Sequence, residues 1–402
     1  MIARTYSAAM EGPLGTADIL VTLAEIVPSD NFLFFAGVCR AWREAWGERP
    51  KATRAVTKHT SPSQLQECFQ CGLRRRKALC VSIVGECNLE VLQCARANGC
   101  PWDANTSSMA ARKGRLEVLQ WAIDQGCPYD ARVSAFAAEA GHLEVLRWVQ
   151  ASSLPWDGST CSSAAKGGHL YVLQWARENG CDWDPRTCAA AARGGHLNVL
   201  RWAHTNGCPW DTATASSAAE GGHLNILRWA RANGCPWNRL TCSAAARGGH
   251  LEVLQWARGN ACPWGGLTVS IAAEGGHFGM LRWARANGCP WGIRTCSGAA
   301  EAGCLDIIQW ARANGCPWDR LTCAAAARNG HLFVLQWVRS RDCPWDEATC
   351  YNAAKGGHLH VLQWARANGC PWDWKTRNGA AINGHSAVVE WAIANGCPEY
   401  IG

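Results

Sequence analysis

The chain has 402 residues, a formal net charge of +7 and 24 cysteines. This modest charge does not indicate the concentrated basic face that is typical of nucleic-acid-binding domains, so we expect no nucleic-acid partner. The start of the chain lacks the pattern of a signal peptide, and no apolar run approaches the ~18 residues of a membrane helix, so we expect no membrane partner.

The amino-terminal part of the chain lacks any repeat. Residues 1–12 are predicted to be disordered, residues 13–50 to form a separate apolar helical segment, and residues 51–60 to be a linker. This segment is therefore predicted to lie outside the repeat array.

Residues 61–402 follow a fixed period of about 27 residues, which is typical of a solenoid in which each repeat contacts only its neighbours. The period indicates about twelve repeats, the first of them a degraded half-repeat at Ser61–Gly72. It is marked by two series of tryptophans, with Tyr129 filling the one gap in the second: Trp121, Trp148, Trp175, Trp202, Trp229, Trp256, Trp283, Trp310, Trp337, Trp364 and Trp391, and Trp102, Trp156, Trp183, Trp210, Trp237, Trp264, Trp291, Trp318, Trp345 and Trp372.

Residues 238–264 illustrate the unit. Thr241 is predicted to cap a first helix, which ends at Gly248-Gly249 because glycine adopts the left-handed conformation of a helix end. His250 then opens a second helix whose apolar residues fall on two adjacent faces. No stretch alternates with period two, so the fold class is predicted to be all-α, without strands, and we expect both tryptophans to be buried inside the stack.

The cysteines recur at fixed repeat positions that also accept Leu154, Ala215 and Val269. A position that tolerates these residues needs a small apolar filler, so we expect reduced, structural cysteines in an intracellular compartment. A zinc set is the alternative for the irregular group Cys68, Cys71, Cys80 and Cys87, but its spacing is poor. We therefore expect no metal and no other cofactor.

One histidine per repeat follows a glycine, as His250 does. Ligands that recur once in every repeat, always at the same position, cannot converge on one ion, so we expect each histidine to hydrogen-bond a neighbouring turn. No phosphate loop, Ser-His-Asp set or carboxylate pair stands outside the repeat, and we expect no enzymatic activity.

Two features could form a partner surface. An arginine row (Arg96, Arg177, Arg231, Arg258, Arg285, Arg312, Arg339 and Arg366) is interpreted as a solvated ridge over tryptophan edges, with an acidic partner as the alternative. Tryptophan with arginine can also indicate single-stranded nucleic acid, but we expect these tryptophans to be needed inside. The positions after Cys-Pro-Trp vary most, as they would in a partner surface or by drift in exposed turns. From them we predict partner-binding residues: Arg186, Arg239, Arg294, Arg320, Trp374 and Lys375.

The repeat resembles the ankyrin repeat, with Thr241, Ala245, Gly249, His250 and Leu254 at matching steps. It is six residues shorter than the ~33-residue ankyrin unit. Ankyrin-like helix pairs without the long β-hairpin finger are therefore implied. This tryptophan-rich variant is similar to ankyrin arrays of very large DNA viruses.

Residues 17–46 resemble an F-box, most closely at Val38-Cys39-Arg40-Ala41-Trp42, although the family's Leu-Pro start is replaced by the reversed and displaced Pro13-Leu14. The resemblance implies adaptor-binding residues Leu14, Ile19, Leu20, Val27, Phe32 and Trp42. It also implies a monomeric adaptor in the host cytoplasm or nucleus that brings a protein to a cullin-RING ubiquitin ligase. The alternative is a plain binding scaffold whose amino-terminal helices only cap the array.

Overall fold

The structure, a computed structural model, describes residues 60–70 and 73–399. This part of the chain contains 25 α-helices and no strand, which confirms the all-α prediction there. The predicted disordered, F-box-like and linker segments lie outside it, apart from Thr60, and so do all six predicted adaptor-binding residues. The chain divides into two compact units between Trp183 and Asp184, and each is described by itself.

The first unit consists of one helix followed by four helical hairpins. The single helix, α5, lies at the predicted half-repeat and packs against α7. Its helices are α5 Pro62–Gln70, α6 Lys77–Glu86, α7 Leu89–Ala97, α8 Ala104–Arg112, α9 Leu116–Asp124, α10 Arg132–Ala140, α11 Leu143–Ala151, α12 Gly158–Gly167 and α13 Leu170–Glu178.

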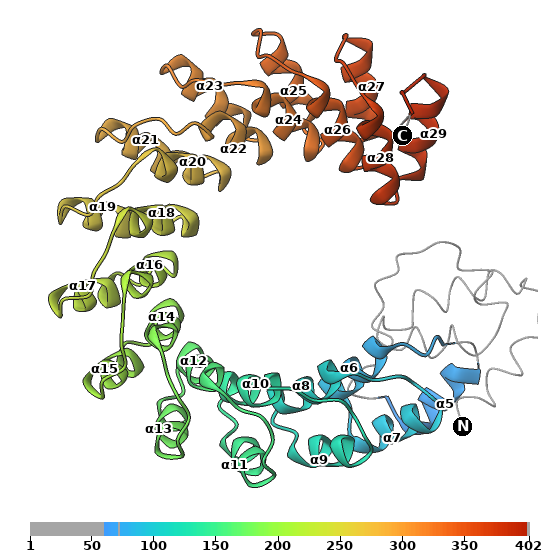
Figure 1. Cartoon of the computed structure of the whole chain (residues 1–402), viewed down its shortest axis with the longest axis vertical. Coiled ribbons are helices and arrows are strands. Elements are labelled where there is room, and N and C mark those ends of the chain that lie inside the picture. The colour runs from blue at the N-terminus through green and yellow to red at the C-terminus, as the bar shows by residue number, and fades with distance from the viewer. Residues whose placement is uncertain (1–59, 71–72, 400–402) are drawn as a thin grey trace, which may run out of the picture. The chain divides into compact units, whose positions relative to one another are not determined.

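The second unit consists of eight hairpins, so the two units together hold the predicted twelve. Its helices are α14 Pro185–Gly194, α15 Leu197–Thr205, α16 Thr212–Glu220, α17 Leu224–Ala232, α18 Arg239–Gly248, α19 Leu251–Gly259, α20 Gly266–Glu274, α21 Phe278–Ala286, α22 Thr295–Glu301, α23 Leu305–Ala313, α24 Arg320–Arg328, α25 Leu332–Arg339, α26 Glu347–Lys355, α27 Leu359–Ala367, α28 Trp374–Ile382 and α29 Ser386–Ala394. Figure 1 shows its first helices in one row and its second helices in another.

The cap of the first helix is an Asp or Asn, not the predicted threonine. In α18 the side chain of Asn238 accepts a hydrogen bond from the amide of Leu240, and Thr241 is buried further along the helix. An Asx oxygen there satisfies an amide that has no partner within the helix. Threonine bonds the helix start in α22, where Gly292 replaces the Asx residue and the Thr295 hydroxyl bonds both backbone groups of Gly292.

The Gly-Gly-His sequence joins each hairpin to its neighbours. Gly249 ends α18 in the left-handed conformation with φ of 75°, as predicted. A Cβ atom on Gly249 would lie 2.7 Å from the ring of His277 in the next hairpin. His250 bonds through Nε2 to the carbonyl of Glu220, 3.1 Å away at the end of the preceding first helix. The structure thus confirms the predicted bond from histidine to a neighbouring turn.

The core lies between the two rows of helices and is made of small side chains. Cys242, Ala245, Leu254, Ala257 and Cys262 are all fully buried. First helices pack directly on the first helices of neighbouring hairpins, as α16 does on α18, because alanines permit a close approach. The tryptophans of both series are only half-buried, so the prediction that they lie inside is wrong. They cover the edge of the stack instead.

Candidate functional site

The predicted arginine row closes the turn of each hairpin. Arg258, near the end of α19, donates from Nη1 to the carbonyl oxygen of Cys262. Its guanidinium lies 4.2 Å from the ring centroid of Trp264. The same two contacts recur at all eight arginines of the row. These arginines therefore lie over tryptophan rings, as expected, and a main role is to hold the turn that follows.

The two tryptophan series meet between neighbouring hairpins. Trp237, in the turn after α17, contacts Trp256 on α19 edge-to-face, with ring centroids 5.8 Å apart. Trp264 and Trp283 repeat this geometry at the next step. An edge-to-face pair adds about 0.5–1.5 kcal/mol beyond its burial. The second helices are thus linked through half-exposed indoles.

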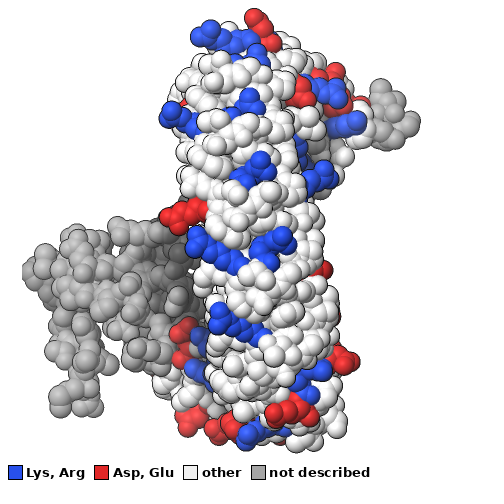
Figure 2. Space-filling model, turned by 90° about the vertical axis from the view of Figure 1, so that its left-hand side faces the viewer, with Lys and Arg blue, Asp and Glu red and all other residues white. Residues whose placement is uncertain are grey.

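A second set of arginines, which sequence analysis missed, lies on the second helices of unit two. Arg201, Arg228 and Arg282 directly precede the tryptophans of α15, α17 and α21 and are exposed. Figure 2 shows the side of the molecule on which α15–α19 lie, where Lys and Arg are frequent along the middle and acidic residues are sparse. The sequence could have revealed this set, because the residue before this tryptophan is Gln in some repeats and Arg in others.

These arginines do not all take the same position. Arg201 and Arg228 lie over the tryptophans of the following hairpins, 5.6 Å from Trp229 and 5.8 Å from Trp256. Arg282 instead lies over Phe278 of its own helix, at 5.8 Å. Trp310, the equivalent tryptophan on α23, is therefore not covered by this arginine.

An open groove of about 570 Å³ lies at this point, between α21 and α23. Gly279 leaves the space, since the equivalent residues on α19, α23 and α25 are Glu252, Asp306 and Phe333. The groove is lined by Gly279, Arg282, Trp283, Arg285, Ala286, Trp310 and Asn314, none of them acidic. Two cations and two indoles in one groove form a site for a ligand that is both anionic and planar.

The predicted partner-binding residues lie elsewhere, at the starts of the first helices. Arg186 pairs with Asp184 at 2.6 Å, Arg294 with Glu301 at 4.0 Å and Arg320 with Asp346 at 3.1 Å. Lys375 lies over the half-buried ring of Trp374 at 5.9 Å, and Arg239 is exposed beside Leu240. These six residues lie at two neighbouring repeat positions in five hairpins and do not converge on one site.

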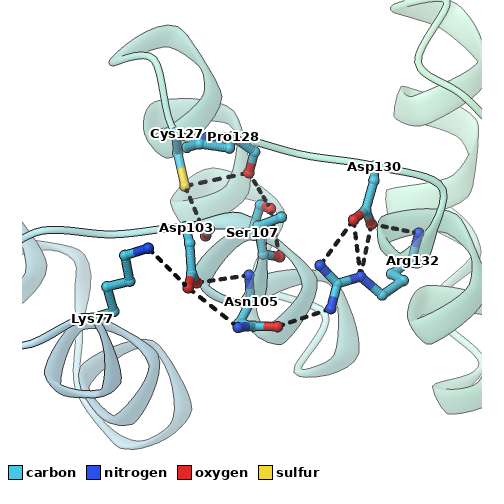
Figure 3. Close-up of polar contacts among 9 residues, drawn as sticks. Lys77, Asp103, Asn105, Ser107, Cys127, Pro128, Asp130 and Arg132 are labelled. Atoms are coloured by element: carbon cyan, nitrogen blue, oxygen red, sulfur yellow. Dashed lines mark hydrogen bonds and ion pairs between the residues drawn. The ribbon is translucent and has the colours of Figure 1, made fainter. Parts of the chain in front are cut away.

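The equivalent row in unit one carries a network of polar contacts (Figure 3). Asp103 caps α8 and lies 3.9 Å from Lys77, whose helix belongs to the preceding hairpin. Arg132 of the next hairpin donates to the Oδ1 atom of Asn105 at 2.9 Å and pairs with Asp130 at 2.8 Å. Side chains of this edge bond across hairpins, so many of its charges are already paired.

No model of a known protein family matches the chain, and no curated protein matches it. The ankyrin and F-box resemblances therefore remain likenesses of motif. No helix in the described ranges is long and apolar enough to cross a membrane.

Among the solved structures that are similar to the chain are two of a pentatricopeptide repeat protein. Both are crystal structures of the pentatricopeptide repeat protein PPR10 in complex with an 18-nt psaJ RNA element, one of them a variant with three cysteines replaced by serine. Each is 14% identical, with a TM-score of 0.33, and the match covers 95% of this chain and 68% of the other. At this distance the likeness says nothing of this chain's own ligand.

The prediction that the chain has no nucleic-acid partner is wrong as an exclusion, because a ground on which it rested does not hold. It assumed that the tryptophans are needed inside, whereas the structure leaves Trp283 and Trp310 half-exposed beside arginines. The chain is a helical repeat protein.

Proposed function

We propose that the chain is a non-enzymatic scaffold that holds an anionic macromolecule against the second helices of unit two. The observation that supports this most directly is the series Arg201, Arg228 and Arg282, exposed on three second helices next to half-exposed tryptophans. Exposed cations on three of four successive second helices, with Gln255 on α19 as the exception, attract a polyanion over a long distance and release its counterions on contact. The indoles add contact area that stays rigid because each ring is held by its neighbours.

The test is the binding of a labelled polyanion, heparin, measured by fluorescence anisotropy over a range of salt concentrations. The triple variant Arg201→Gln, Arg228→Gln, Arg282→Gln should bind at least ~10-fold more weakly and with a shallower salt dependence. We expect the fold to tolerate glutamine at these three positions, since Gln255 and Gln309 occupy the same repeat position in other hairpins. The matched control is the triple variant Arg186→Gln, Arg239→Gln, Arg320→Gln on the first helices. An equal loss of heparin affinity in both variants would show that binding depends on net charge and not on where the arginines lie.

We also propose, from the motif Val38-Cys39-Arg40-Ala41-Trp42, that the amino-terminal segment docks the scaffold on a host cullin-RING ubiquitin ligase. In this proposal the array is an ankyrin-type substrate receptor of viral origin. The competing proposal is an ankyrin-type scaffold with no ubiquitin link, in which residues 13–50 cap the first hairpins.

The effect of Trp42→Ala separates these two proposals. If the segment docks on the ligase, the variant loses binding to the purified adaptor subunit while the melting temperature of the array stays unchanged. If the segment caps the array, the variant lowers the melting temperature, because a cap contributes stability through its contacts with the first repeat. A protein with neither change would contradict both.

A further inference from the structure

We propose that the groove between α21 and α23 binds single-stranded nucleic acid, with a base against Trp310 and a phosphate beside Arg282. This inference rests on the proposed function and names the ligand class for the same face. It follows from three features of the groove.

The first feature is the space that Gly279 leaves. A Cβ atom built on this glycine meets nothing within 4 Å, so the opening is not filled by another part of the protein. On α19 the same position carries Glu252, whose carboxylate would repel a phosphate. The α21 groove is therefore both wider and less acidic than its counterpart on α19.

The second feature is the position of the indole on the far wall. The ring of Trp310 contacts Trp291 at 5.8 Å and Phe278 at 5.6 Å, both edge-to-face. The carbonyl of Asn314 accepts a hydrogen bond from Nε1 of Trp291 at 3.1 Å, which fixes that neighbour in turn. The plane of Trp310 is thus set in advance, and base stacking on such a fixed ring contributes about 1–3 kcal/mol.

The third feature is the arrangement of the cations. Arg282 is exposed at the mouth of the groove, and the half-buried Arg285 lies in its wall, with an Nε atom that is buried and lacks a hydrogen-bond partner. Arg228 and Arg201 continue the charge on the second helices of two earlier hairpins, α17 and α15, at the same repeat position as Arg282. A ligand that repeats a negative charge and a planar ring along its length matches arginines and indoles that recur on α15, α17 and α21. An acidic peptide would supply the charges without the rings.

Binding is tested with fluorescein-labelled oligo-uridine and oligo-deoxythymidine, with a labelled Asp/Glu peptide of equal charge and with inorganic polyphosphate. At least one oligonucleotide should bind more tightly than the peptide and the polyphosphate, and its binding should quench tryptophan fluorescence. The relative affinity of the two oligonucleotides tells whether the strand is RNA or DNA. If all four probes bind equally, charge alone is responsible, and the inference fails.

The chain itself supplies a matched pair of variants. Gly279→Glu places in the groove the carboxylate that α19 tolerates at the equivalent position, and it should weaken oligonucleotide binding at least ~10-fold. His360→Glu places a carboxylate at the equivalent exposed position of α27, which carries none of the three arginines, and should change binding less than ~2-fold. Equal effects of the two variants would overturn the groove as the site. Both should melt as the unaltered protein does, because both positions are exposed.

The failure of this inference can be told from the failure of the proposed function. If the acidic peptide binds in preference to the oligonucleotides, and Gly279→Glu abolishes that binding, the ligand class is wrong while the scaffold and its face stand. If neither the oligonucleotides, the peptide, the polyphosphate nor heparin binds, both proposals fall.

Discussion

The glycine before each histidine determines how closely two neighbouring hairpins approach. Gly249 and Gly234 are both left-handed, with φ of 75° and 84°. They differ in surroundings, since a Cβ atom on Gly234 would meet nothing within 4 Å, whereas one on Gly249 would strike His277. Gly234 is therefore required only by its backbone conformation, whereas Gly249 is required by its backbone conformation and by the nearby ring of His277.

We predict that Gly249→Ala destabilises the protein far more than Gly234→Ala. The left-handed conformation costs about 1–2 kcal/mol for alanine at either site, and the clash with His277 adds roughly 1–3 kcal/mol. Urea unfolding of the two variants checks the difference. In a double-mutant cycle, His277→Ala should recover part of the loss in Gly249→Ala and none in Gly234→Ala. Equal losses would mean that the histidine moves aside freely.

The cysteines are filler residues, and buried ones such as Cys235 and Cys289 keep protonated thiols. The described cysteines form no disulfide bond, and in the repeat of α18 and α19 the thiol of Cys242 faces Cys262 of the same hairpin. Burial is the main cause that raises the pKa of Cys235 and Cys289 to about 11. At neutral pH such thiols are poor nucleophiles, because the thiolate is the reactive form.

This raised pKa predicts a loss of stability at alkaline pH. A thiol whose pKa is higher in the folded than in the unfolded protein binds its proton more tightly when folded. Its contribution is complete below about pH 9 and is lost as the pH rises to about 11. Urea unfolding between pH 8 and pH 11 should show this decline, and Cys235→Ala/Cys289→Ala should flatten it. If the free energy of unfolding falls with pH as steeply in the variant as in the parent protein, groups other than these two thiols cause the decline.

At the scale of the helix, the start of most first helices is set by one Asx residue. Arg76 takes its place before α6, and two hairpins of unit two have a glycine there. Gly265 precedes α20 without a side-chain cap, and Gly292 precedes α22, which begins late in the repeat, at Thr295. The late start leaves Ile293 88% exposed.

We predict opposite effects for the same substitution at these two glycines. Gly265→Asp restores the cap and should stabilise the protein by a few tenths to about 1 kcal/mol, because the site is open and its backbone is extended. Gly292→Asp should destabilise it, since a Cβ atom there would lie 2.1 Å from the Gly266 carbonyl. Thermal melting of both variants checks the two signs. Stabilisation by Gly292→Asp would show that the contact with Gly266 relaxes.

At the scale of the molecule, stability within a unit is a sum over neighbouring hairpins. In unit two, direct contacts run from α14 to α16, from α16 to α18 and so on, one hairpin at a time. A disturbance should therefore spread outward from its origin and fade with distance.

Leu254→Ala in α19 tests this locality. Removing a fully buried leucine should cost about 3 kcal/mol. Hydrogen exchange measured by mass spectrometry should accelerate most in α17–α21, with little change in α26 and α27. Arg239→Ala, an exposed change on α18, is the control and should leave exchange near the parent level. Uniform acceleration through all eight hairpins would show that unit two unfolds as one cooperative body.

The sequence by itself determined the architecture of the described residues. A strict period, with glycine, histidine and apolar positions in fixed places, defines twelve helical hairpins, because repeats of the same pattern pack against their neighbours in the same way. It also indicated the left-handed glycine at Gly249, which follows from the backbone requirement of a helix end. The histidine bond was indicated by the period, which places each such histidine beside the turn of the preceding hairpin.

Only the tertiary structure decided which side chains are covered. The repeat pattern suggested that tryptophans such as Trp256 fill the core, but alanines and cysteines bring the helices so close that no room is left there for an indole. The tryptophans therefore lie at the edge, where the arginines reach them. The equivalent arginines Arg201 and Arg228 lie over the tryptophan of the next hairpin, whereas Arg282 lies over Phe278. The repeat pattern alone does not predict this difference.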